Sequence, residues 1–403
     1  MSIRGRAVHF FVNRIAPGAI LQSRVLPTAS GDLVFLGDGL SLHGEWGEWF
    51  PTESVRAIGD ETLLIADAHE FVAAIEAPRA LVLMLGTADL LGMGGSGSPA
   101  QAAQRLDALV ALATSRFGAK AVVVVGVPLR PVLGIRAAAF NSKLASLVVA
   151  RGATFVPAPA FAGDAADGYL LSAIRWDAAV YAELAQPVGD AIGVPVAVGT
   201  APRPLTGEVK GLVVRAQHKR AQLFEVLPRP TGRVILYGDS ITEGGFWDGW
   251  LPGMPVANRG IGGDTVAELA ARIDTAIESP LAVSLLAGTN DLQRGEPRDA
   301  VSIAGRFREL VAQIRERDAK VPIVINSVMP RAAKFADDIT TINALYREIA
   351  TEFDAHYLDL WPVLATPARA LRKELTRDGL HLNAEGYRAW VGLLRPALEA
   401  AIG

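Results

Sequence analysis

Short apolar runs recur along the chain, separated by segments in which apolar positions have a helical spacing. In the C-terminal half the runs cover residues 234–237, 282–287, 321–327 and 356–360. Runs without polar alternation are typical of parallel strands buried on both faces. One helix face between the first two runs, which Asp264 could cap, carries Val266, Leu269, Ala270, Ile273 and Ile277. The alternation predicts a doubly wound α/β domain with its ligand site at the carboxyl ends of the strands.

The N-terminal half repeats this pattern. The "GD" pair at 37–38 matches the pair at 238–239 with an offset of 201 residues. "EAPRALVLMLGTAD" from Glu76 matches "ESPLAVSLLAGTND" from Glu278 with an offset of 202, and the runs ending at Pro128 and Pro330 keep that offset. A steady offset over many segments indicates duplication of a whole domain.

Residues 196–232 match neither half. "TAPRPLTGE" and "LPRPTG" have turn and linker composition, whereas "KGLVVRAQHKRAQLFEVL" between them is apolar enough to be ordered, with room for a strand or two. We interpret 196–232 as a connecting segment between an N-terminal domain, residues 1–195, and a C-terminal domain, residues 233–403.

Polar residues of the C-terminal domain gather where its strands should end. They lie in "YGDSIT" (237–242), "NRGIGGDT" (258–265), "AGTND" (287–291) and "RDGLHLNAEGY" (377–387). Taken alone, each block is typical of a helix cap or a tight turn. Four compatible blocks in one chain order, at successive strand ends, favour a catalytic site instead.

These four blocks resemble those of the SGNH (GDSL-type) hydrolase family, over essentially all of residues 233–403. The resemblance implies two tandem flavodoxin-like (SGNH-type) three-layer α/β/α domains with parallel sheets, of which the second is an esterase. It also implies the site residues. Ser240 would be the nucleophile, His381 its general base, and Asp378 the group that orients His381. The oxyanion hole would comprise the backbone N–H groups of Ser240 and Gly263 and the side-chain amide of Asn290.

The chemistry of acyl transfer is consistent with this set. A serine hydroxyl needs a base to take its proton, and the base needs a third group to hold its ring. The D-x-x-H spacing of Asp378 and His381 can place both side chains on one side of a turn. Trp247 and Trp250 follow the nucleophile closely, so they could line the substrate mouth, or they could pack a helix against the sheet.

The corresponding positions of the N-terminal domain lack these groups. Ser240, Gly263, Asn290 and His381 align with Gly39, Glu61, Ala88 and Ser172, respectively. Ser41 lies two residues beyond the nucleophile position, and neither His43 nor His69 occupies the position of the base. We therefore predict that this copy is catalytically silent and has a structural or substrate-binding role.

Composition excludes several other functions. With 39 basic and 42 acidic residues, the formal charge of −3 gives no reason to expect a nucleic acid partner. The absence of cysteine removes disulfides and thiolate metal sites. "GMGGSG" at 92–97 does not directly follow a strand, so it does not predict a dinucleotide site. We expect no metal and no cofactor.

Targeting signals are also weak. His9 and Arg14 interrupt the apolar patch near the N-terminus, and no uncharged run approaches the ~20 residues of a membrane span. We therefore expect no membrane span and a cytoplasmic location, with secretion as the alternative.

The sequence thus predicts a serine esterase acting on a short-chain acyl ester, first of all an O-acetyl group on a small molecule or carbohydrate. An acyltransferase that uses the same acyl-enzyme, or a lipase or thioesterase, is the alternative within the same chemistry. A non-catalytic binding protein is the alternative of a different class.

Overall fold

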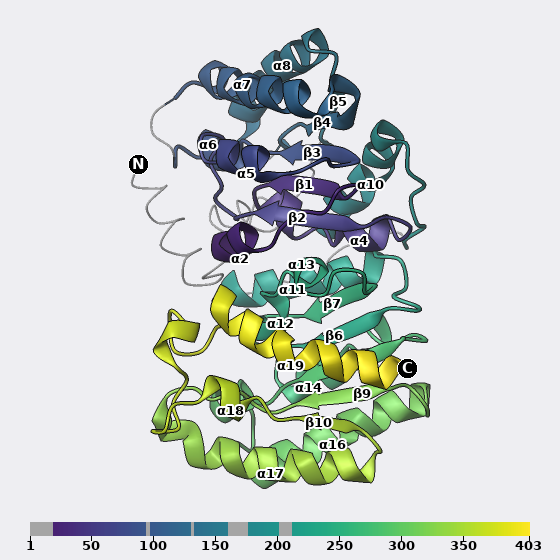
Figure 1. The fold of residues 1–403 in the computed structure, drawn as a ribbon, viewed down its shortest axis with the longest axis vertical. Coiled ribbons are helices and arrows are strands. Elements are labelled where there is room, and N and C mark those ends of the chain that lie inside the picture. Colours follow the sequence, from purple (N-terminus) through teal and green to yellow (C-terminus); the bar gives the residue numbers. More distant parts are fainter. Residues whose placement is uncertain (1–18, 94–96, 130–132, 160–175, 201–211) are drawn as a thin grey trace. The chain divides into compact units, whose positions relative to one another are not determined.

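The computed structural model describes residues 19–93, 97–129, 133–159, 176–200 and 212–403. The chain divides into two compact units, Met1–Pro228 and Arg229–Gly403. Each unit contains a five-stranded parallel sheet (Figure 1).

The sheet of the first unit has the order β2-β1-β3-β4-β5. Its strands are β1 (Leu33–Gly37), β2 (Val55–Gly59), β3 (Ala80–Met84), β4 (Val122–Val125) and β5 (Thr154–Val156). The connecting helices are α2 (Ala19–Val25), α3 (Gly39–Leu42), α4 (Trp46–Trp49), α5 (Ala68–Ala74), α6 (Thr87–Leu90), α7 (Pro99–Phe117), η1 (Ala119–Ala121), α8 (Gly134–Ala150), α10 (Ala178–Ile192) and α11 (Leu212–Val226). Apolar side chains of α5, α7 and α8 form one continuous core with the sheet.

The second unit repeats the strand order, as β7-β6-β8-β9-β10. Its strands are β6 (Val234–Gly238), β7 (Val256–Gly260), β8 (Ala282–Leu286), β9 (Ile323–Asn326) and β10 (His356–Leu358). Numbered within each unit, both sheets have the order 2-1-3-4-5 of flavodoxin-like domains. The predicted fold class of two flavodoxin-like α/β domains with parallel sheets is therefore confirmed.

Helices cover both faces of the second sheet. They are α12 (Ser240–Glu243), α13 (Trp247–Trp250), α14 (Val266–Ala271), η2 (Ile273–Thr275), α15 (Asp291–Arg294), α16 (Ala300–Arg317), η3 (Ala333–Phe335), α17 (Ala336–Glu352), α18 (Trp361–Leu364), η4 (Lys373–Leu375) and α19 (Ala384–Ile402). On one face, α14, α16 and α17 share an apolar core with alternate residues of the strands. On the other, α19 contacts β8, β9, β10 and α13 (Figure 1).

The described part of the predicted connecting segment, residues 196–200 and 212–232, contains a helix and not a strand. Helix α11 follows the undescribed residues 201–211, packs against α10 and belongs to the first unit. Backbone bonds from Ala197 N–H to the Trp49 carbonyl (2.8 Å) and from Thr200 N–H to the Val226 carbonyl (3.0 Å) attach residues 197–200 to the same unit.

The expectation that Asp264 caps the helix after β7 is wrong. Thr265 is the N-cap, and its hydroxyl and the Glu268 carboxylate form a capping box. The hydroxyl of Thr265 lies one residue closer to the helix, so Asp264 is left to bind Arg272, at 2.7 Å. The helix also ends earlier than predicted, at Ala271, and a short 3₁₀ turn continues to Thr275.

Candidate active site

Ser240 is the first residue of α12, directly beyond the carboxyl end of β6. Asp239 caps this short helix by accepting a hydrogen bond from Ile241 N–H at 2.9 Å. A side chain at Gly238 would collide with the Leu286 carbonyl, 2.5 Å from its Cβ, so glycine is needed where β6 and β8 end together. The turn thus places Ser240 two residues beyond the end of β6.

His381 and Asp378 come from the segment before α19 and complete a hydrogen-bonded relay with Ser240. The His381 Nε2 atom lies 2.9 Å from Ser240 Oγ, and His381 Nδ1 lies 2.6 Å from Asp378 Oδ2. Residues 141 positions apart in the chain therefore meet at hydrogen-bonding distance. This is the geometry in which a base can take the proton of a serine hydroxyl.

Asp378 also shapes the turn that carries His381. Its Oδ1 atom accepts hydrogen bonds from the backbone N–H groups of Leu380 (3.0 Å) and His381 (2.8 Å). Thr376 also stabilises this turn, because its hydroxyl donates a hydrogen bond to the His381 carbonyl at 2.7 Å. One carboxylate therefore holds both the backbone and the ring of the histidine.

The same contacts determine the ionisation of Asp378. Burial on its own raises the pKa of this carboxyl, but the hydrogen bond from His381 and the charge of that ring lower it more. Together with the backbone N–H bonds, they hold the pKa of Asp378 well below its usual range. Asp378 is therefore an anion at any pH near neutrality, as a group that stabilises a protonated histidine must be.

Two of the three expected oxyanion donors, Gly263 and Asn290, lie on neighbouring loops. Gly263 has a φ of 88°, a conformation that favours glycine, in the loop after β7. Asn290 follows β8, and its side-chain amide donates to the Asp264 carbonyl at 2.9 Å and, at 3.4 Å, to Asp239 Oδ2. The bond to Asp239 is long and weak, so the Asn290 N–H group that makes it could instead donate to a stronger acceptor.

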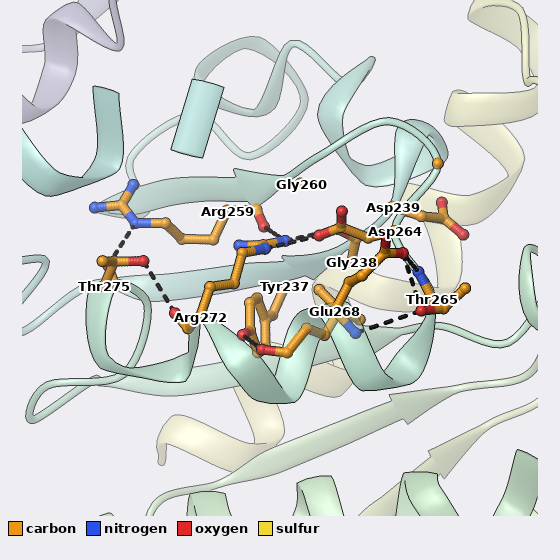
Figure 2. Close-up of polar contacts among 12 residues, drawn as sticks. Tyr237, Gly238, Asp239, Arg259, Gly260, Asp264, Thr265, Glu268, Arg272 and Thr275 are labelled. Atoms are coloured by element: carbon orange, nitrogen blue, oxygen red, sulfur yellow. Dashed lines mark hydrogen bonds and ion pairs between the residues drawn. The ribbon is translucent and has the colours of Figure 1, made fainter. Parts of the chain in front are cut away.

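Arg272 fastens this loop to the ends of the strands. Its guanidinium donates to the carbonyls of Gly238 (3.2 Å) and Arg259 (2.9 Å) and pairs with Asp264. Figure 2 shows Arg272 extending between β7 and the loop, beside the ring of Tyr237. One partly buried cation thus ties together three backbone segments near Ser240.

Glu243 is a site residue that the sequence analysis did not identify. It lies one helical turn beyond Ser240, and its Oε2 atom accepts a hydrogen bond from Gly262 N–H at 2.6 Å. Gly260 makes this approach possible, because a Cβ there would lie 2.2 Å from the Glu243 nitrogen. Glu243 therefore positions the glycine loop against α12, and its place at i+3 from Ser240 was the available signal.

Trp247 and Trp250 pack inside the unit. They are only 3% and 8% exposed, and Trp247 Nε1 donates to the Thr242 carbonyl at 2.8 Å. Trp247 makes edge contacts with Tyr387 and Trp390, and Trp250 stacks near Tyr387. This geometry favours the packing alternative, in which the pair holds α13 against α19.

Two buried carboxyl groups near Ser240 are destabilised as anions. Burial raises the pKa of Asp239 to about 7, although the bond from Ile241 N–H opposes the shift. Burial likewise raises the pKa of Asp264 to about 6, against the attraction of Arg272. A carboxyl group whose pKa is higher in the folded than in the unfolded chain stabilises the fold while it is protonated. This stability is fully present below the ordinary pKa of 3.8 and is lost as the pH rises through the pKa of the folded state.

Asp239→Asn should remove part of this pH dependence. Asparagine keeps an oxygen that can cap α12 but has no charge to bury. The melting temperature of the variant, measured against that of the wild type by circular dichroism, should therefore rise progressively from about pH 4 to about pH 8. Asp338→Asn, at an exposed position of α17, is the matched control. Parallel pH curves for Asp239→Asn and wild type would show that Asp239 is not the group responsible.

Several structural hydrogen bonds occur at corresponding positions of both units. A strand-end aspartate caps the following helix, a tryptophan indole donates to a backbone carbonyl, and an asparagine oxygen accepts from the backbone after the fourth strand. The donor–acceptor pairs are Leu40–Asp38 and Ile241–Asp239, Trp46–Ser41 and Trp247–Thr242, and Val127–Asn141 and Val328–Asn343.

The positions that the sequence analysis predicts to be catalytic differ between the units. Gly39 begins α3 where Ser240 begins α12, and Ala88 lies in α6 after β3, whereas Asn290 directly precedes α15 after β8. Glu61 lies 3.4 Å from His43 Nε2. Ser172, which aligns with His381, and part of the 92–97 glycine motif lie outside the described residues.

Helix α11 contributes two buried cations beside His43 of the first unit. Lys219 pairs with Asp177 at 2.9 Å, and Arg220 pairs with Glu45 at 2.8 Å. Both cations line a small cavity together with His43, Trp176, Tyr181 and Leu223. Ion pairs of the connecting segment therefore occupy this part of the first unit, beside rings of residues 43, 176 and 181.

Neither a membrane helix nor a metal cluster is found in the described part of the chain. None of its helices is long and apolar enough to cross a bilayer. Nor do its histidine, aspartate and glutamate side chains form a group of three or more that could hold a metal ion.

Comparison with known proteins places the second unit near one family. Residues 236–389 match the model of the GDSL-like Lipase/Acylhydrolase family. Similar solved structures include a GDSL-like lipase from Bacteroides thetaiotaomicron, 25% identical, with 46% of this chain and 98% of that chain covered and a TM-score of 0.39. A carbohydrate esterase family 3 protein from Talaromyces cellulolyticus is 19% identical, with 43% and 98% covered and a TM-score of 0.34. No curated protein matches the chain.

Proposed function

We propose that the second unit is a serine ester hydrolase that works through an acyl-enzyme. Ser240 Oγ attacks the ester carbonyl carbon while its proton passes to His381 Nε2. The tetrahedral intermediate collapses, the C–O bond to the alcohol breaks, and His381 returns the proton to the departing alcohol. Water then attacks the acyl-enzyme by the same route and releases the acid and free Ser240.

The continuous relay from Asp378 through His381 to Ser240 is the observation that carries this proposal. Its two contacts, at 2.6 and 2.9 Å, are both within hydrogen-bonding distance. The match of residues 236–389 to the GDSL-like Lipase/Acylhydrolase family supports the same reaction class. The N–H of Ser240, the N–H of Gly263 and the amide of Asn290 would then stabilise the oxyanion.

For the substrate we propose a short acyl ester, first an O-acetyl group on a small molecule or carbohydrate. This choice rests on the resemblance of the four sequence blocks to the SGNH hydrolases. Transfer of the acyl group to a sugar hydroxyl is the second candidate, because the acyl-enzyme is the same and only the acceptor differs.

We propose further that the first unit is a duplicated copy that has lost catalysis and serves a structural or substrate-binding role. The shared strand order and the corresponding capping and indole hydrogen bonds support a common origin. Glycine at 39 and alanine at 88 supply neither a nucleophile nor an amide donor.

A panel of esters tests the proposed function. The full-length protein is incubated with p-nitrophenyl esters of increasing acyl length and with an acetylated sugar, and free acid and acylated acceptor are quantified. Acetyl esters should be hydrolysed fastest, with free acetate as the product, and a fluorophosphonate should label Ser240. If no ester is cleaved and folded protein is not labelled at Ser240, the hydrolase proposal is wrong.

A further inference from the structure

Arg331 is a buried cation that follows the carboxyl end of β9. In the sheet, β8 separates β9 from β6, the strand that precedes Ser240. The residue is 8% exposed. Its Nη1 atom donates to the Thr289 carbonyl at 3.1 Å and contacts the Thr289 hydroxyl at 3.4 Å. The guanidinium carbon lies 4.4 Å from the centre of the Phe335 ring. These contacts hold the guanidinium in one place, beside the loop that carries Asn290.

The charge of Arg331 has no carboxylate partner within ion-pair distance in the described part of the chain. Burial lowers the pKa of Arg331, while the charges of Asp239 and Asp378 oppose the shift, and an arginine remains a cation under all these conditions. Burying a cation without a counterion is costly. An apolar side chain would fill the same space without the free-energy cost of burying a charge.

The free edge of the guanidinium is available to a ligand. Nε and Nη2 make no hydrogen bond to any described residue, and neither is among the fully buried polar atoms. The residues whose charges act on Arg331 are Asp239, beside the nucleophile, and Asp378, beside the base. The bond to Thr289, which directly precedes Asn290, places the guanidinium beside the loop of an expected oxyanion donor.

Comparison of the two units separates Arg331 from the structural residues. The strand-end aspartates, the indole bonds and the asparagine that braces the fourth strand are present in both. At the position of Arg331, after the matching prolines 128 and 330, the first unit has Leu129, which packs against the apolar core. Arg331 therefore belongs with Ser240 and Asn290, the groups that the first unit lacks.

We propose that Arg331 binds an anionic group, a carboxylate or a phosphate, on the alcohol part of the ester substrate. The proposal rests on the hydrolase function above and narrows its substrate class to esters of acidic alcohols, such as an acetylated acidic sugar. A guanidinium with two free donors matches the two oxygens of such a group, and a site with little water strengthens the interaction. The bound anion also supplies the missing counterion.

Matched acetyl esters test this assignment. Phenyl acetate, 3-acetoxybenzoate and 3-acetoxyphenyl phosphate share one acyl group and differ in the charge on the alcohol. Wild type should prefer at least one anionic ester over phenyl acetate by about 10- to 100-fold in kcat/KM. Arg331→Met should abolish that preference, mainly through KM, and leave phenyl acetate hydrolysis within about threefold of wild type. Arg331→Lys should keep part of the preference.

Lys334→Met is the control variant, because Lys334 is an exposed cation beside the same Phe335 ring. It should retain the full preference. Equal losses on the charged and neutral esters in Arg331→Met would show that Arg331 only positions the Thr289 loop, and would overturn the proposal. A wild-type enzyme that prefers phenyl acetate would also overturn the proposal. The same holds if the only preferred anionic ester is phenyl hydrogen succinate, in which the charge is on the acyl group.

A binding measurement separates failure of this proposal from failure of the hydrolase function. Dissociation constants of the same esters are measured by calorimetry with the Ser240→Ala protein, which needs no turnover. Tighter binding of an anionic ester, lost in Ser240→Ala/Arg331→Met, would support the anion site even if wild type hydrolysed none of them. Equal binding of charged and neutral esters would overturn it whatever the catalytic result.

Discussion

Ser240→Ala should lower kcat for acetyl ester hydrolysis by about 10⁴-fold or more and abolish fluorophosphonate labelling. Alanine removes the only atom that can form the acyl-enzyme, whereas the oxyanion donors and His381 remain in place. The residual rate then reflects water attacking a bound ester. KM should change little, because the hydroxyl contributes little to ground-state binding. Initial rates with p-nitrophenyl acetate and mass spectrometry of the labelled protein are the measurements.

Ser41→Ala is the matched control in the first unit. Ser41 is fully buried, two residues beyond Gly39, and its backbone carbonyl accepts the hydrogen bond from Trp46 in either variant. We expect full activity and full labelling in this protein. A rate that survives Ser240→Ala but falls in Ser41→Ala would move the nucleophile to the first unit and refute the assignment of a silent copy.

The strand-end chemistry could be predicted from the sequence because parallel strands end at a common edge. Apolar runs located β6 and β8, whereas β7, with the sequence VANRG, has no such run and was implied only by the polar block that starts within it. The three blocks at the ends of β6, β7 and β8 contain Ser240, Gly263 and Asn290. His381 lies much further along the chain, and it was proposed from the resemblance of its block to that of the SGNH hydrolases, with which the D-x-x-H spacing is compatible. Local sequence patterns are enough to locate the strand-end residues, because each polar block forms the turn that follows its own strand.

Contacts between distant segments could not be predicted in the same way. The apolar spacing left Trp247 and Trp250 open to two interpretations, and only their packing against the ring of Tyr387 decides between them. Arg331 follows its strand without any motif, so nothing in the sequence marks its missing counterion. Such features depend on which side chains meet in the folded chain, and a one-dimensional pattern does not contain them.

Asp378→Asn should lower kcat by about 10²- to 10⁴-fold with the fold intact. The asparagine oxygen can replace Oδ1 and keep accepting from the N–H groups of Leu380 and His381, so the turn survives. The amide nitrogen then faces His381 Nδ1 where Oδ2 was. Since that nitrogen donates, Nδ1 must accept, and the ring proton is forced onto Nε2. An Nε2–H cannot take the proton of Ser240.

The structural part of this prediction has its own control. Asp378→Ala loses both the turn contacts and the ring contact, so it should lower the melting temperature as well as the rate, whereas Asp378→Asn should lower only the rate. Because its contacts hold the pKa of Asp378 below the usual range, any loss of wild-type activity above about pH 4 must come from another group. An Asp378→Asn enzyme that kept its rate within about threefold would mean that His381 is oriented by the turn alone, since the carboxylate charge and the tautomer it selects would then be dispensable.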